Sequence, residues 1–228
     1  QEEKPAGLAV FGNWPTIYPA LSQLPAPAKE SWFAFDHYYS DAAFDAALPY
    51  IFASSPTKLY DVGGNTGKWS LRCCRYDENV AVTILDLPQQ IALAQENIAK
   101  AGFSHRIAFH AVDMLSPATL PGDADVWWMS QFLDCFSPDQ IVAMLARVAQ
   151  AMKPGARLCI MELFWDAQKF EAASFSLNAT SLYFTCMANG NSRFYSVEKF
   201  YHYLERAGFR VEQRLDNLAA RLPSPGRQ

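Results

Sequence analysis

The sequence has no basic stripe, no apolar run long enough to cross a bilayer, and no apolar leader at its polar, acidic start. Its 19 Lys and Arg residues are outnumbered by 23 Asp and Glu residues, so the net charge at pH 7 is −4. Proteins that bind nucleic acid backbones usually carry a basic surface, which makes DNA and RNA poor candidates for the main ligand. Without spanning or leader segments, we expect a cytoplasmic protein that has no membrane partner and no nucleic acid partner.

The five cysteines do not form a recognisable site: their number is odd, and their spacing does not match a metal centre. The adjacent pair Cys73-Cys74 falls in an apolar segment. We interpret the cysteines as small buried hydrophobic residues in a reducing compartment, and we expect no metal. The chain starts with Gln1 rather than Met, which we take as a sign of a trimmed or truncated N-terminus.

Apolar and aromatic residues are abundant. Half of the 228 residues are hydrophobic and 14% are aromatic, with many of the aromatic residues before residue 55 and between 160 and 203. A chain of this length can bury a large core, and it suits one α/β domain with some additional helix. The aromatic residues belong either to the core or to a pocket for a flat substrate.

The first 56 residues differ from the rest of the chain. They are rich in proline and predict short helical segments at Thr16–Gln23, Lys29–Tyr39 and Ala42–Phe52. We interpret residues 1–56 as a helical lead-in that covers the pocket, and residues 57–228 as the main domain.

From residue 57 onward, strand patterns alternate with helix patterns. The predicted strands are Leu59–Val62, Val80–Leu85, Arg106–Val112, Asp125–Met129, Arg157–Phe164 and Phe209–Leu215. The predicted helices are Gly67–Tyr76, Gln89–Ala101, Pro138–Met152, 168–188 and Val197–Ala207. This alternation predicts an α/β fold, with a doubly wound, mostly parallel sheet of Rossmann type covered by helices on both faces.

A glycine-rich turn follows the first predicted strand. The strand ends at Asp61, and Gly63, Gly64, Asn65 and Gly67 come directly after it. Glycines are needed where the backbone bends sharply and a ligand must approach it closely. In a doubly wound sheet the ligand binds outside the carboxyl ends of the strands. We therefore predict that these five residues bind a cofactor.

Acidic residues end the next two strands as well. Asp86 lies about twenty residues after the glycine turn and is followed by Leu87. A carboxylate at this place can accept both hydroxyls of a ribose. Asp113 and Met114 follow the third strand and can accept from an adenine amino group and pack on its ring. Gln131, which follows the fourth strand, can also face the cofactor.

Two kinds of nucleotide cofactor fit a glycine turn of this sort. The turn does not match G-x-G-x-x-G, the pattern typical of nicotinamide dinucleotide sites. A carboxylate at Asp61 repels a pyrophosphate but suits the cationic amino group of S-adenosylmethionine. We therefore favour S-adenosylmethionine, and a Rossmann oxidoreductase that binds a dinucleotide is the weaker alternative.

Three stretches carry a family resemblance: Leu59–Leu87 with its D-V-G-G-N-T-G turn and the following D-L-P, Pro154-Gly155, and the tail Arg193–Phe209. Together they resemble the small-molecule O-methyltransferase family of the caffeate and hydroxyindole type, over roughly residues 57–215. The resemblance implies a seven-stranded sheet and transfer of a methyl group from S-adenosylmethionine to a small aromatic or polyketide-like acceptor. It also implies a homodimer if the full-length chain has the winged-helix domain found at the N-terminus of the family; these residues do not contain that domain in full.

The sequence departs from the family at the catalytic histidine. The family has His-Asp after the fourth strand, and alignment on the aspartate puts Leu133 at the histidine position. Leucine cannot accept a proton, so one interpretation is that another residue is the base, with His37 and Asp134 as the candidates. Glu162 matches an acidic family position near the reacting groups. Two other interpretations remain open: an acidic acceptor that needs only positioning, and a chain that binds the cofactor or a partner without transferring a methyl group.

The resemblance and the aromatic pattern also predict residues that contact the acceptor. These are Tyr38, beside His37, and Tyr183, Met187 and Asn191 on or after the helix that covers the acceptor pocket in the family. After Leu215 the sequence shows no convincing strand, so we expect that either the sheet lacks the antiparallel strand that closes it in the family or the chain is cut.

Overall fold

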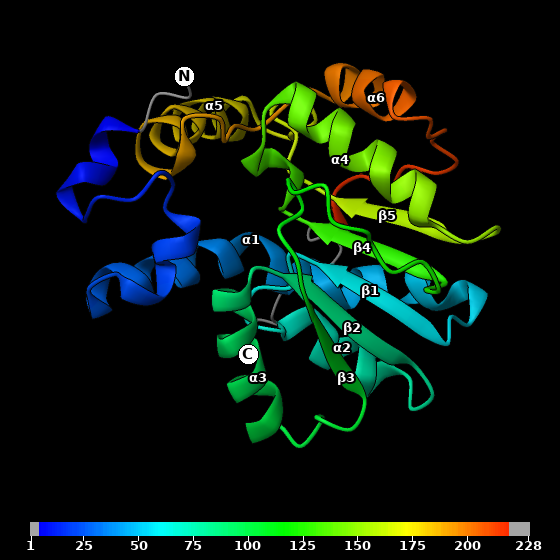
Figure 1. Ribbon diagram of the computed structural model, residues 1–228. Coiled ribbons are helices and arrows are strands. Elements are labelled where there is room, and N and C mark those ends of the chain that lie inside the picture. The colour runs from blue at the N-terminus through cyan, green and yellow to red at the C-terminus, as the bar shows by residue number, and fades with distance from the viewer. Residues whose placement is uncertain (1–4, 219–228) are drawn as a thin grey trace, which may run out of the picture.

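The computed structural model describes residues 5–218, and the side chains of all of these except Pro19, Ser22 and 35–39. Five parallel strands form its sheet in the order β3-β2-β1-β4-β5 (Figure 1). The strands are β1 (Lys58–Val62), β2 (Ala81–Asp86), β3 (Ile107–Ala111), β4 (Val126–Ser130) and β5 (Arg157–Met161). The strand order reverses between β1 and β4, so the predicted doubly wound parallel fold is confirmed.

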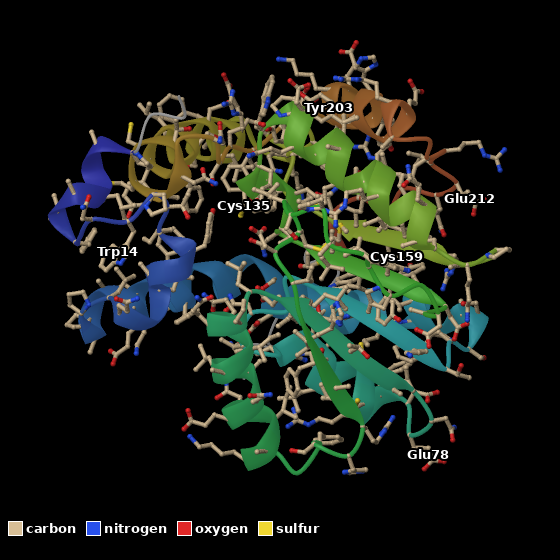
Figure 2. The ribbon with its side chains drawn as sticks, in the orientation of Figure 1. Trp14, Glu78, Cys135, Cys159, Tyr203 and Glu212 are labelled. Carbon is tan, nitrogen blue, oxygen red and sulfur yellow. The ribbon has the colours of Figure 1, made fainter. Side chains whose placement is uncertain are left out.

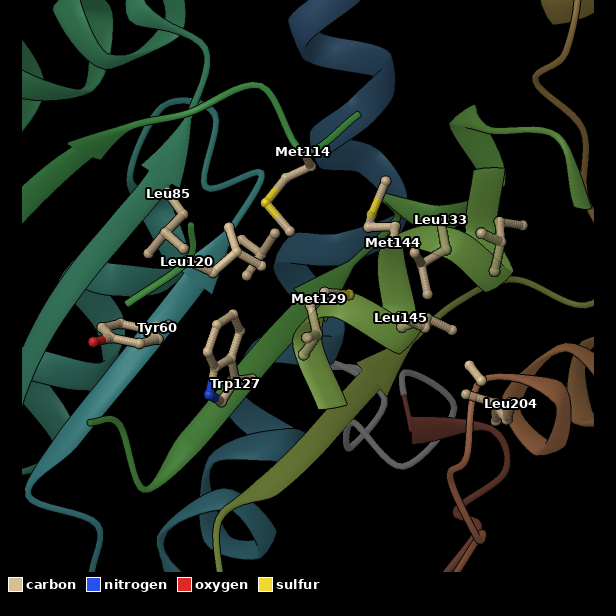
Figure 3. Packing of buried hydrophobic residues seen from close by; sticks show 14 of the residues in the cluster. Tyr60, Leu85, Met114, Leu120, Trp127, Met129, Leu133, Met144, Leu145 and Leu204 are labelled. Atoms are coloured by element: carbon tan, nitrogen blue, oxygen red, sulfur yellow. The ribbon is translucent and has the colours of Figure 1, made fainter. Parts of the chain in front are cut away.

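The two faces of the sheet are covered by different helices. On one face, Tyr60 and Trp127 pack with α4 (Pro138–Ala151) and α6 (Val197–Arg206) in a core that also contains Met129, Met144 and Leu145 (Figure 3). On the other face, Leu59 and Trp128 pack with the end of α1 (Ala26–Ile51) and with α2 (Lys68–Tyr76) and α3 (Pro88–Lys100). Neighbouring residues such as Trp127 and Trp128 enter opposite layers because side chains alternate along a strand.

The first part of the lead-in, before the end of α1, lies beyond the carboxyl ends of the strands. The arrowheads of β4 and β5 point toward a layer made of the lead-in and α5 (Glu171–Phe184) (Figure 1). Short helical turns at Ala6–Val10 and Tyr18–Gln23 contribute to this layer, and Leu8, Ile17 and Leu21 pack there with Ala188. The division between residues 1–56 and 57–228 stays a prediction.

The predicted break between the helices Lys29–Tyr39 and Ala42–Phe52 is wrong, because α1 runs through both as one helix. The stretch that we expected to separate them contains Ser40 and Asp41, and neither residue excludes helical backbone. Ser40 is buried, and Asp41 forms an ion pair with Lys68 of α2 at 2.9 Å. Tertiary packing of α1 against α2 thus supports a continuous helix.

The predicted sixth strand, Phe209–Leu215, is also wrong. Within residues 5–218 the sheet ends at β5, and residues 209–217 have no regular structure. A strand requires a neighbouring strand to pair its backbone groups. Here a groove of about 950 Å³ separates the segment from β5, and residues of α1 and α6 also line it.

Candidate active site

The turn after β1 is packed too closely for side chains. Gly63 has φ +70°, and a Cβ atom there would lie 2.3 Å from the ring of Phe132. A Cβ atom on Gly64 would lie 2.9 Å from both Asp61 Oδ2 and Ile84 Cγ2. Gly67 has φ +80° and its position is closed by Ile98. The glycines therefore let the chain pass close to Asp61 and to the turn after β4.

Asp61 lies at the base of this turn and is 3% exposed. Its Oδ2 atom accepts a hydrogen bond from Ser70 Oγ at 2.6 Å. Burial raises the pKa of Asp61 to about 7, and the negative charge of Asp86 contributes to the rise. A cationic group of a ligand beside this carboxylate would favour its ionised form.

Asp86, at the end of β2, holds the glycine turn from the other side. Its carboxylate accepts the backbone N–H groups of Asn65 at 2.9 Å and Leu87 at 2.7 Å. Burial raises the pKa of Asp86 to about 6. Asn65 has φ +50°, a left-handed conformation that is uncommon outside glycine. The structure thus brings together the glycine turn and Asp86, which are about twenty residues apart in the sequence.

A cavity of about 70 Å³ opens beside Asp61. Five predicted cofactor residues line it, namely Asp61, Gly63, Gly64, Asn65 and Gln131. Gln131 directly follows β4 and has φ +46°, and its N–H donates to the carbonyl of Met161 at 2.9 Å. Strained backbone of this kind is concentrated at functional sites. The other lining residues were not predicted from the sequence and come from α1, the glycine turn, α2 and β4: Ser40, Phe44, Thr66, Lys68, Trp69, Trp128 and Ser130.

Besides Gly67, four other predicted cofactor residues lie outside the lining of this cavity. Asp86 and Leu87 adjoin it through Asn65. Asp113 is exposed, and its Oδ1 atom accepts the N–H of Leu115 at 2.8 Å. Met114 is 4% exposed in the core between the sheet and α4 (Figure 3). Adenosine contacts by these four residues stay a prediction.

A second polar cluster joins the turn after β4 to the end of β5. Glu162 Oε1 accepts the backbone N–H groups of Phe132 at 3.0 Å and Leu133 at 2.8 Å. Glu162 Oε2 is buried and has no hydrogen-bond partner. Burial raises the pKa of Glu162 well above its ordinary value, and the charge of Asp134 raises it further. Burial also raises the pKa of Asp134.

Leu133 and Asp134 differ in their surroundings, although they are adjacent. Leu133 is 0% exposed and packs in the main core with Met144 and Leu145 (Figure 3). Asp134 Oδ1 accepts from Cys135 Sγ at 3.5 Å, and its charge acts on Glu162 and on Tyr18 of the lead-in. The turn therefore presents position 134, and not position 133, to the polar cluster.

Segments from three parts of the chain meet at this cluster. Tyr18 Oη and Ser192 Oγ are hydrogen-bonded at 2.9 Å, and Asn189 Nδ2 donates to the carbonyl of Cys135. Figure 2 shows Cys135 at the end of the sheet that faces Trp14 of the lead-in. Sequence analysis had no signal for Asn189 and Ser192, because their role depends on how the segment after α5 folds back.

The predicted acceptor residues have different surroundings, and their contact with an acceptor stays a prediction. Tyr183 is 54% exposed, and Met187 packs so closely on Gly7 that a Cβ atom there would lie 2.1 Å from its sulfur. Asn191 donates its backbone N–H to Asn189 Oδ1 at 2.8 Å. The side chains of His37 and Tyr38 lie outside the described residues.

Residues 5–218 contain neither a candidate membrane span nor a candidate metal cluster. No helix there is long and apolar enough to cross a membrane. No three His, Cys, Asp or Glu side chains among these residues gather closely enough to hold a metal ion.

Known proteins resemble this chain in sequence. Residues 43–210 match the O-methyltransferase domain family. The N,N-dimethyltransferase OxyT of Streptomyces rimosus is 28% identical over 95% of this chain and 62% of its own length. Acetylserotonin O-methyltransferase of Gallus gallus is 30% identical over 69% of this chain and 43% of its own length. The chain thus spans less than two thirds of the length of these relatives.

Solved structures share the fold. The mitomycin 7-O-methyltransferase MmcR is 24% identical with a TM-score of 0.72, over 87% of this chain and 56% of its own. Human N-acetylserotonin methyltransferase, solved with S-adenosylmethionine, has a TM-score of 0.61 at 20% identity, over 73% of this chain and 46% of its own. The family match covers well over half of the sequence. The chain therefore belongs to the O-methyltransferase family, whose cofactor is S-adenosylmethionine.

Proposed function

We propose that this chain transfers a methyl group from S-adenosylmethionine to an oxygen of a small aromatic or polyketide-like acceptor. The proposal rests on four consecutive residues after β4, which connect the cavity beside Asp61 to the polar cluster at Glu162. Gln131 lines the cavity beside Asp61, Phe132 and Leu133 donate to Glu162, and Asp134 follows directly. One short turn therefore joins a cavity for the cofactor to a buried pair of carboxylates.

The residues that line the cavity themselves support S-adenosylmethionine as its ligand. Asp61 is a buried hydrogen-bond acceptor that suits a cationic amino group. Gly64 has no side chain, and a Cβ atom at that position would collide with the carboxylate of Asp61. When bound, S-adenosylmethionine supplies a methyl group activated by its sulfonium. The chain has to hold the acceptor in line with that group and exclude water, which accelerates the reaction by positioning.

Asp134 is the residue that we propose as the base. An acceptor hydroxyl loses its proton as it is methylated, and Asp134 in its ionised form can accept that proton. Burial raises the pKa of both carboxyl groups, and the charge of Asp134 raises that of Glu162 further, so the pair favours a state that shares one proton. Two buried carboxylates that share one proton divide the roles of base and support in this way.

The choice of oxygen follows from the family match. The name of the relative from Gallus gallus gives an oxygen acceptor, and that of OxyT gives a dimethylated nitrogen. The model that matches residues 43–210 is an O-methyltransferase domain, so we propose oxygen.

A second candidate function is a module that binds the cofactor without transferring a methyl group. Leu133 favours it, because that residue cannot accept a proton and is wholly buried. The test incubates the full-length protein with methyl-labelled S-adenosylmethionine and a panel of phenols, naphthols and polyketide aromatics, and detects labelled product by mass spectrometry.

Labelled product on oxygen supports transfer and excludes the second candidate. Calorimetric binding of the demethylated cofactor, combined with no product from any acceptor, overturns transfer in favour of the binding module. Absence of cofactor binding overturns both proposals.

A further inference from the structure

The segment after α5 holds the backbone of the turn that presents Asp134. Three successive carbonyl groups of this turn, at residues 134–136, accept hydrogen bonds from that segment. The donors are the backbone N–H of Arg193 at 2.8 Å, Asn189 Nδ2, and Tyr195 Oη at 2.6 Å. The position of Asp134 therefore depends on where the segment after α5 lies.

Ser192 connects this segment to the lead-in, and its side chain is buried. Its Oγ atom lies 3.0 Å from Asn189 Oδ1 and 3.5 Å from the carbonyl oxygen of Cys135. Both of these oxygens can only accept, so the single hydroxyl proton of Ser192 is donated to them. The third neighbour of Ser192 Oγ is Tyr18 Oη at 2.9 Å, and Tyr18 is therefore the donor in that bond.

The hydroxyl of Tyr18 lies close to the polar cluster. Burial raises the pKa of Tyr18 well above its ordinary value, and the charges of Cys135 and Asp134 raise it further. Tyr18 therefore keeps its proton over the pH range in which Asp134 ionises. It can donate to Ser192 while Asp134 acts, and it does not compete with Asp134 as a base.

The backbone of Tyr18 is bound on two sides. Gln90 Nε2, in the first turn of α3, donates to the carbonyl of Tyr18 at 3.1 Å. Helix α3 follows Asp86, whose carboxylate holds the glycine turn. On the other side, the backbone N–H of Ile17 donates to the carbonyl of Ala188 at 2.8 Å. Tyr18 therefore links the cofactor side of the molecule to the segment that fixes the turn after β4.

We propose that Tyr18 is a positioning residue for Asp134. Its hydroxyl fixes Ser192, and the segment that contains Ser192 fixes the turn that aims Asp134 at the acceptor. Misplacement of a reacting group by about 1 Å can lower a rate by about 10²-fold, so a bond remote from the chemistry can affect kcat. The inference rests on the proposed function for the role of Asp134 as the base.

The experiment compares Tyr18→Phe, Ser192→Ala, Asp134→Asn and their pairwise combinations in the full-length protein, with an acceptor that the wild type methylates. Tyr18→Phe removes the donor and keeps the ring. Tyr60→Phe is the matched control, because it removes the hydroxyl of another buried tyrosine, whose partner Asp123 is outside the polar cluster. Steady-state kinetics give kcat and KM, calorimetry gives the Kd of S-adenosylhomocysteine, and urea denaturation gives the stability.

We expect Tyr18→Phe to lower kcat roughly five- to fiftyfold, and Ser192→Ala to act in the same direction, with the Kd unchanged. In the Asp134→Asn background, Tyr18→Phe should lower kcat no further, because no base remains to be positioned. The kcat of Tyr18→Phe alone should still fall at low pH, since Asp134 is present. The control Tyr60→Phe should lose stability and keep the wild-type kcat.

The stability data test the same link without activity. Tyr18→Phe and Ser192→Ala together should lose less stability than the sum of the two single losses, because both changes remove the same hydrogen bond. Additive losses would overturn the link through Ser192.

The inference is also overturned if Tyr18→Phe keeps the wild-type kcat, if it raises KM alone, or if its effect multiplies with that of Asp134→Asn. A rise in KM alone would show direct contact with the acceptor, and a multiplied effect would show that Tyr18 does not act through the base. All three outcomes leave the wild type active. A wild type that binds the cofactor and methylates no acceptor instead overturns the proposed function, and the role of Tyr18 falls with it.

Discussion

The carboxylate of Glu162, one residue beyond β5, accepts the backbone N–H of Leu133, in the turn after β4, at 2.8 Å. This bond ties the edge strand of the sheet to the turn that presents Asp134. It also places a second carboxylate beside Asp134, and the charge of Asp134 acts on it. Glu162 therefore affects both the geometry of the turn after β4 and the protonation of the Glu162–Asp134 pair.

Replacement of Glu162 by Gln and by Ala should separate these two roles. Gln keeps an oxygen that can accept the N–H groups of Phe132 and Leu133, so the free energy of unfolding should stay close to that of the wild type. Ala leaves those donors without an acceptor, which should lower the free energy of unfolding by about 1–3 kcal/mol. Urea denaturation measures both. Equal stability of Glu162→Ala and the wild type would show that the bonds to the turn contribute nothing.

Asp134→Asn should abolish most of the activity while leaving cofactor binding unchanged. Loss of a general base typically lowers kcat by about 10²- to 10⁴-fold. In the wild type, kcat should fall as the pH drops through the pKa of Asp134, which burial raises above its ordinary range, because the base must be ionised. The remaining activity of Asp134→Asn should not show this fall of kcat at low pH. Rate profiles from pH 4.5 to 9, together with calorimetric Kd values, provide the measurement.

A control for this prediction introduces histidine at two adjacent positions. Leu133→His would bury an imidazole in the apolar core and should destabilise the fold by roughly 2–4 kcal/mol without supplying a base. Asp134→His should fold and retain more activity than Asp134→Asn. A Leu133→His variant with wild-type stability and increased activity would contradict the orientation of this turn.

Asp61→Asn should lower the affinity for the cofactor and stabilise the ligand-free protein against unfolding. Burial raises the pKa of Asp61 to about 7, so in the folded state it holds a proton at pH values where the unfolded chain has lost it. Stability therefore falls as the pH rises from about 4 to 7 and stays low above that range. Removal of the ionisable group should recover up to about 4 kcal/mol at pH 8. The same raised pKa predicts that the affinity of wild-type protein for the cofactor falls below pH 7.

Chemical denaturation across pH 5–8 and calorimetry at each pH test these statements. Asp123→Asn is the control, because Asp123 is exposed and its pKa is lowered by its hydrogen bond from Lys58. That variant should keep the wild-type slope of stability over this range and the wild-type Kd. A flat profile for wild-type protein would overturn the assignment to Asp61.

Gly64→Ala should lower the affinity for the cofactor far more than Gly102→Ala does. A Cβ atom at Gly64 would lie 2.9 Å from Asp61 Oδ2 and from Ile84, so Asp61 must move. We expect at least a tenfold rise in Kd and a loss of about 1–3 kcal/mol of stability. Gly102 has φ +79° and open space around it, so Ala there should cost about 1 kcal/mol and leave Kd unchanged. Equal Kd values for the two variants would refute the role of Gly64.

Local patterns were sufficient to predict that Asp61, the glycine turn and Asp86 lie together. Asp61 and the glycines after it lie in one stretch, and strand ends in a parallel sheet meet at one edge, so the position of Asp86 could be predicted too. The polar cluster that contains Glu162 and Asp134 depends on contacts between distant segments. Tyr18 and Ser192 are hydrogen-bonded although 174 positions separate them, and no local pattern encodes that pairing.

The order of hydrophobic and polar residues in this chain was enough to predict the alternating strands and helices and the glycine turn with its carboxylates, because side-chain period and backbone freedom are local properties. Three outcomes required the folded molecule. Phe209–Leu215 has strand-forming residues but pairs with no strand within residues 5–218. Leu133 and Asp134 are adjacent, yet one enters the core and the other meets Glu162. Trp69 and Trp128 look like ordinary core residues until packing leaves their N–H groups without acceptors. Burial and pairing depend on what the rest of the chain brings to each residue.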